Sequence, residues 1–71
     1  MTPRQQRAYE LARIAKSIAF FQDIVKRRVQ LIPKLPPEDA WITRFEISND
    51  KFMIKRFRAE YKELLNKPLG A

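Results

Sequence analysis

The chain has 71 residues, with 15 lysines and arginines against 8 aspartates and glutamates, and a formal net charge of +7. It contains no cysteine and no histidine, which excludes a disulfide framework, a thiolate zinc site and the commonest general base. The only glycine is Gly70, so no glycine-rich phosphate loop can form. We expect a single small domain over residues 1–71 that is not an enzyme and needs no metal or cofactor.

The sequence carries no signal for export or membrane insertion. The first seven residues, Met-Thr-Pro-Arg-Gln-Gln-Arg, are not followed by an apolar run of the signal-peptide type. No stretch approaches the roughly 18 apolar residues that a membrane span needs. We therefore expect no membrane association and an intracellular location, in the cytoplasm, the nucleus or an organelle matrix.

Residues 3–31 are predicted to form one long helix. Thr2 is a suitable N-cap and Pro3 suits the first helical position. Apolar residues then recur at spacings of three and four, which fits the period of a helix and not that of a strand. The stripe comprises Leu11, Ile14, Ile18, Phe21, Val25 and Ile32. Arg28 takes the one position in it where an apolar residue is expected, and Pro33 ends the helix.

The proline-rich segment 33–37 is predicted to be a stiff connector. Pro37 can begin a second helix, with Glu38 and Asp39 placed favourably at its positive end. Residues 38–47 are ambiguous, because their apolar residues fit one face of a short helix and also alternate as in a strand. We favour the helix; the alternative is a β-hairpin over residues 41–57.

Residues 49–67 are predicted to form the last helix. Ser48, Asn49 and Asp50 are all favourable N-cap residues. The apolar face of this helix comprises Ile54, Phe57, Tyr61, Leu64 and Leu65. The expected fold is all-α, with the two long helices packed as an antiparallel hairpin around a short proline-flanked middle element; the alternative is α+β.

Positive charge is concentrated in the two outer parts of the chain. Residues 1–32 carry a net charge of +5 and residues 51–71 a net charge of +4, whereas residues 33–50 carry −2. On the last helix, four cations recur at spacings of four, three and four, beside the apolar face: Lys51, Lys55, Arg58 and Lys62. Such a row suits contacts with successive phosphates, although a solvated face that maintains solubility has the same pattern.

The first helix has a second face on which aromatic and charged residues alternate. Its members are Tyr9, Arg13, Lys16, Phe20, Asp23 and Arg27. Three readings are open: packing against the middle element, a protein interface, and nucleic-acid binding through base stacking and phosphate contacts. The basic run from Lys26 to Arg28 is a weak signal by itself and also complements the negative end of the helix.

Trp41 is the lone tryptophan. In a chain of this size we expect it first at the centre of the core, and second as an anchor for a protein partner. The favoured function is a small basic nucleic-acid-binding protein that contacts phosphates and acts as a dimer or as a subunit of a larger assembly. The alternative is a helical adaptor without nucleic-acid contact. The candidate nucleic-acid-binding residues are Arg13, Lys16, Lys26, Arg27, Lys51, Lys55, Arg58 and Lys62, and the candidate protein-interface residues are Tyr9, Phe20 and Trp41.

Overall fold

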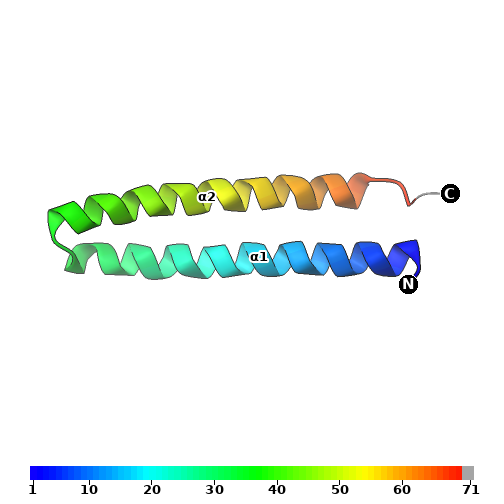
Figure 1. The fold of residues 1–71 in the computed structure, drawn as a ribbon, viewed down its shortest axis with the longest axis horizontal. Helices are drawn as coiled ribbons and strands as arrows, with labels where there is room; N and C mark the ends of the chain where they lie inside the picture. Colours follow the sequence, from blue (N-terminus) through cyan, green and yellow to red (C-terminus); the bar gives the residue numbers. More distant parts are fainter. Residues whose placement is uncertain (70–71) are drawn as a thin grey trace.

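Two long helices form an antiparallel hairpin, as expected from the sequence (Figure 1). The structure is a computed structural model and describes residues 1–69. Helix α1 spans Pro3–Leu31, a short 3₁₀ turn η1 spans Ile32–Lys34, and helix α2 spans Pro37–Asn66. The helices lie side by side over almost their whole length, and the start of α1 and the end of α2 both lie at the end opposite the connector. No strand occurs within residues 1–69, so the α+β alternative is wrong.

Helix α1 begins and ends where the sequence predicts. The Thr2 hydroxyl accepts a hydrogen bond from the Gln5 backbone N–H at 3.2 Å, and the Gln5 side chain accepts one from the Thr2 backbone N–H at 2.9 Å. This reciprocal capping box satisfies two donors that the first turn of a helix leaves without partners. Pro33 is the second residue after the helix. The expectation that Pro33 pushes the preceding residue out of helical geometry is wrong, because Ile32 keeps helical dihedral angles (φ −49°, ψ −47°) and donates its backbone N–H to the Arg28 carbonyl. The helix ends here because Pro33 has no backbone N–H to donate.

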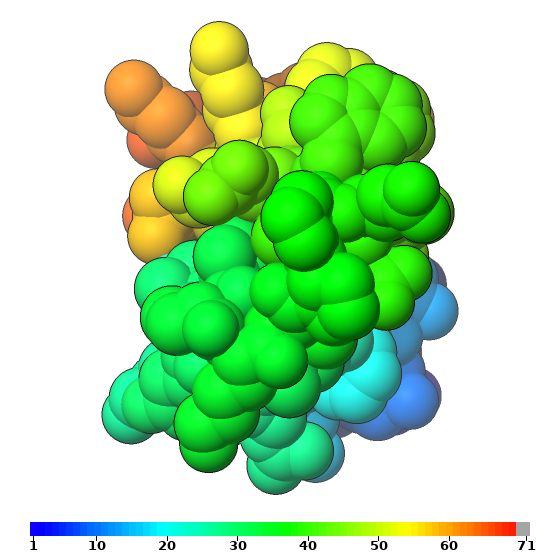
Figure 2. All heavy atoms as spheres, turned by 90° about the vertical axis from the view of Figure 1, so that its left-hand side faces the viewer, coloured from blue at the N-terminus to red at the C-terminus, as the bar shows by residue number. Residues whose placement is uncertain are grey.

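Helix α2 is one continuous helix, which corrects the expected division of this region. It begins at Pro37, with Glu38 and Asp39 in its first turn as predicted. The separate short element at 38–47 and the new helix start at 48–50 are absent, because residues 48–50 continue the helix without a break. An end-on view shows that the connector residues cover the loop end of both helices (Figure 2).

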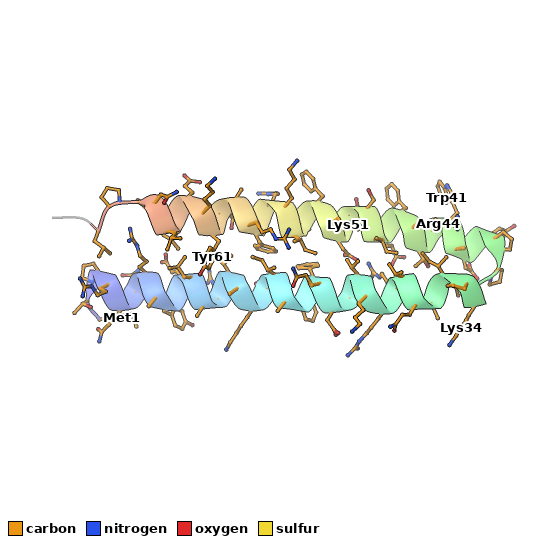
Figure 3. The ribbon with its side chains drawn as sticks, turned by 180° about the vertical axis from the view of Figure 1, so that it is seen from behind. Met1, Lys34, Trp41, Arg44, Lys51 and Tyr61 are labelled. Carbon is orange, nitrogen blue, oxygen red and sulfur yellow. The ribbon has the colours of Figure 1, made fainter. Side chains whose placement is uncertain are left out.

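The core is a narrow seam between the two helices. Ala40, Ile47 and Ile54 of α2 are buried, and they recur every seven residues along the seam. Phe21 of α1 lies against Phe57 of α2, with ring centroids 5.8 Å apart, and Tyr61 also lies between the helices (Figure 3). A seven-residue repeat of inward-facing positions on both helices is the packing of an antiparallel coiled coil.

One layer of this seam is ionic. Asp50 occupies an inward position and is only 8% exposed. The Arg28 guanidinium donates to the Asp50 carboxylate, and it also contacts Glu46 Oε2 at 2.9 Å. Arg28 is the residue that interrupts the predicted apolar stripe, and its partners lie on the other helix. A partly buried pair of this kind favours one register of the two helices, because a shift along the seam would leave the Asp50 carboxylate buried without its partner.

The hairpin is strongly elongated. Its Cα atoms extend over 56 × 15 × 12 Å, with a radius of gyration of 16.5 Å, whereas a compact domain of this length has a radius near 11 Å. The accessible surface is 6003 Å², against about 4,700 Å² for a compact monomer of this mass. Two helices alone therefore leave much of each helix exposed, including several large apolar side chains.

Candidate nucleic-acid interface

A continuous α2 extends the predicted basic row toward the loop. Arg44 lies seven residues before Lys51 and therefore on the same face. At 100° per residue, the five cations fall within an arc of about 60° and cover about 27 Å of helix. They are Arg44, Lys51, Lys55, Arg58 and Lys62, and all five are exposed. Figure 3 shows Arg44 and Lys51 following one another along α2 from the loop end.

This basic row lies beside the apolar seam, as predicted, and forms one wall of a groove between the helices. The groove holds about 480 Å³ and is lined by Gln22 and Val25 of α1 and by Lys51, Ile54, Lys55 and Arg58 of α2. Val25 and Ile54 provide an apolar floor between polar rims. Lys26 lies one turn after Gln22, so its side chain belongs to the same side of the hairpin. We call these six cations, Lys26 with the row of five, the basic side.

No acidic residue of α2 shares the arc of the basic row. The nearest are Asp50 and Glu63, each about 80° from one edge of the arc. Asp50 is directed into the seam, where Arg28 neutralises it. Within the described residues, no cation of the basic side takes part in an ion pair. Apart from these six cations, the sequence has nine cations and eight acids, which nearly cancel. The six other cations of α1 still outnumber its two acids, so the basic side holds a large part of the positive charge and not all of it.

The opposite side of α2 carries balanced charge. We call it the mixed side; it comprises Arg56, Glu60, Glu63 and Lys67. Three of these residues line a second hollow, together with Ile14 and Leu64. The two sides flank the same seam and differ in their charge.

On α1, a row of alanines shares the helix face of Gln22, which lines the groove. This set was not predicted from the sequence; its members repeat at spacings of four, three and four: Ala8, Ala12, Ala15 and Ala19. They precede Gln22 on its face. The pairing of Phe21 with Phe57 and of Arg28 with Asp50 places Ala15 and Ala19 alongside the C-terminal end of the basic row. Alanine projects little above a helix surface, and the cations of α2 are therefore open to a ligand from this direction.

The other predicted nucleic-acid contacts on α1 are not part of the basic side. Arg13, Lys16 and Arg27 lie on the outer face of α1, and the structure does not bring them near the basic row of α2. Arg27 instead pairs with Asp23, with 3.1 Å between Nε and Oδ2. Of the eight predicted contacts, five lie together: Lys26, Lys51, Lys55, Arg58 and Lys62.

The candidate protein-interface residues are all exposed. Tyr9 and Phe20 lie on the outer face of α1 and are each 63% exposed, and within residues 1–69 no third element packs over them. Trp41 is 67% exposed, so the expectation that it forms the centre of the core is wrong. It projects from α2 away from α1 (Figure 3), because its neighbour Ala40 takes the inward position. Exposure leaves all three available to a partner.

Comparisons of the chain with known protein families, with curated proteins and with solved structures found no match. Among the described residues, neither helix is long and apolar enough to cross a membrane.

Proposed function

We propose that this protein binds nucleic acid through its phosphate backbone, using the basic side of the hairpin. The observation that supports this most is the row of five exposed cations on α2, free of acidic neighbours over about 27 Å. Successive cations are three or four residues apart, which is a rise of about 4.5–6 Å. A rod with cations at such intervals can follow a chain of phosphates.

The rest of the geometry supports the same function. Phosphate contacts need cations that are not already neutralised, and the basic side meets this condition. The ionic layer of Arg28 and Asp50 fixes α2 against α1 and so keeps the basic row on one side. The alanines of α1 leave the approach open. Contacts of this kind carry little sequence information, so we expect binding with weak sequence preference.

A salt titration tests the proposal. Fluorescence anisotropy of a labelled 20-base-pair duplex is measured at 50 and 200 mM salt. If four to six cations contact phosphates, the logarithm of affinity falls with the logarithm of salt with a slope near −4 to −5. The affinity then drops roughly 250- to 1,000-fold between these conditions. A slope near zero, or no binding at tens of micromolar protein in low salt, would overturn the proposal.

The exposed apolar surface favours a second candidate function, a helical subunit that assembles with itself or with a larger protein. The accessible surface exceeds that of a compact monomer by about 1,300 Å². A standard interface needs only about 800 Å² from each partner. Tyr9, Phe20 and Trp41 supply aromatic side chains of the type that is enriched in interfaces.

The two functions are compatible, since a dimer carries two basic sides. Sedimentation equilibrium of the intact protein between about 5 and 200 µM measures the assembly state. A mass above 8.5 kDa that falls when Tyr9 and Phe20 are both changed to alanine would support self-assembly through α1. A strictly monomeric species over the whole range would exclude self-assembly.

A further inference from the structure

The outer surface of α2 carries an aromatic row next to its basic row. Trp41, Phe45 and Phe52 are 67%, 60% and 60% exposed. Because α2 is continuous through residues 48–50, these three side chains fall within an arc of about 40°. That arc directly adjoins the arc of the basic row, on the side away from α1. A break at residues 48–50 would have removed Phe52 from this alignment.

The first two aromatics already form a flat platform. The rings of Trp41 and Phe45 are stacked with an interplanar angle of 17° and centroids 6.4 Å apart. Trp41 precedes Arg44 by one helical turn, and Phe52 precedes Lys55 by one turn. Two of the three aromatics therefore have a neighbouring cation of the basic row.

Exposed aromatic rings beside a line of cations match the two chemical parts of a single-stranded nucleic acid. Its bases have free faces that stack on aromatic side chains, while its phosphates contact lysine and arginine. In a duplex the base faces are covered by neighbouring base pairs, and only the phosphates remain for such a surface. A purely apolar protein partner would leave the adjoining cations without a counter-charge.

We propose that the preferred ligand of this surface is single-stranded nucleic acid, with bases stacked on Trp41, Phe45 and Phe52 and phosphates held by the basic row. This inference rests on the proposed function and goes further by assigning the strand form and the stacking residues. It gives Trp41 a role in base contact in place of its predicted role as an anchor for a protein.

The lone tryptophan provides a direct readout of stacking. The intact protein is titrated with a 20-nucleotide single strand and, separately, with a 20-base-pair duplex, at 50 mM salt. Affinity is measured by anisotropy of the labelled probes, and unlabelled probes are used to follow the fluorescence of Trp41. We expect the single strand to quench this fluorescence and the duplex to bind with little quenching.

Substitutions separate stacking from charge. We expect Trp41→Ala to lower the affinity for the single strand roughly 5- to 150-fold, the range found for loss of one stacked base, and to change duplex affinity less than twofold. Trp41→Phe retains a ring and should recover most of the loss. Ile42→Ala is the control, because Ile42 is 48% exposed next to Trp41 but falls on the face of α2 that carries the mixed side, and it should change neither affinity. Circular dichroism confirms that each variant keeps its helices.

Each other result has a definite meaning. Equal affinity for both probes, unchanged by Trp41→Ala, would overturn the stacking inference and leave phosphate binding in place. Absence of binding to either probe would overturn the proposed function itself. Fluorescence that responds to protein concentration and not to the oligonucleotide would assign the aromatic row to a protein interface, and so overturn the inference.

Discussion

The basic side and the mixed side of the hairpin flank the same apolar seam and differ in their charge. On the basic side, five cations of α2 occur without an acid among them, beside a groove with an apolar floor. On the mixed side, two cations flank two acids along the helix. Packing requires neither arrangement, since both sets of side chains are outside the seam. The difference in charge between the two sides is therefore not a consequence of core packing.

The separation of the basic side from the mixed side depends on a fixed rotation of α2 against α1. The ionic layer of Arg28 and Asp50 holds this rotation. Asp50→Ala leaves the Arg28 guanidinium in the seam with Glu46 as its remaining partner. We expect the free energy of unfolding to fall by about 1.5–3 kcal/mol, the value of a hydrogen bond to a charged group, because Arg28 is partly exposed and keeps Glu46 as a partner. Urea denaturation followed by circular dichroism measures it.

A double variant tests whether the ionic layer sets the register of the helices without adding to the stability of the protein. Arg28→Leu combined with Asp50→Leu removes both charges together and fills the layer with apolar groups. Such replacements are often neutral or stabilising, so we expect stability to recover at least to that of the original protein. A loss below about 0.5 kcal/mol in Asp50→Ala alone would contradict the role given to this layer.

The floor of the groove on the basic side is also part of the core. Ile54 is buried and lines the groove between the helices. Ile54→Ala should lower the free energy of unfolding by about 2–5 kcal/mol, as large-to-small core substitutions do. The same denaturation experiment checks it. A loss much smaller than this range would show that the groove floor is not packed as described.

Two adjacent residues test whether phosphate contact differs between the basic side and the mixed side. Lys55 belongs to the basic side and Arg56 to the mixed side, although they are neighbours in the sequence. Lys55→Gln should reduce the magnitude of the salt slope for duplex binding by about 0.9, because one phosphate contact is lost. Arg56→Gln, which changes the net charge equally, should leave the slope unchanged. Equal effects would remove the distinction between the sides.

Much of the fold could be predicted from local patterns. The cap at Thr2, the end of α1 before Pro33 and the start of α2 at Pro37 are set by neighbouring residues, and the three-and-four spacing of apolar residues identified the seam of α1. The error at residues 48–50 has a tertiary cause. Ser48, Asn49 and Asp50 have the side chains of a helix start, but the partner that draws Asp50 into the seam is 22 residues away on α1.

The same error limited the prediction of the site. Lys51, Lys55, Arg58 and Lys62 could be aligned because they lie within one uninterrupted helical pattern. Arg44 could not be added to them, nor Phe52 aligned with Trp41, until residues 37–66 were known to form one helix. Trp41 was expected in the core from its size alone, whereas the register of α2 gives the inward position to Ala40. Stacking on nucleic acid stays a proposal.

The most direct test of the account reverses charge on one side at a time. One variant changes Lys51, Lys55, Arg58 and Lys62 to glutamate; its control changes Arg4, Lys34, Arg56 and Lys67, none of which belongs to the basic side. Each variant has a formal net charge of −1 in place of +7. Anisotropy with the labelled duplex at 50 mM salt measures binding, and circular dichroism verifies helix content.

We predict that the basic-side variant loses binding by more than about 100-fold, because it loses four of the expected phosphate contacts. The control should lose less than about tenfold, since only the long-range field of the protein changes. Equal losses in two folded variants would contradict the account, because binding would then follow net charge and not the side of the hairpin that carries it.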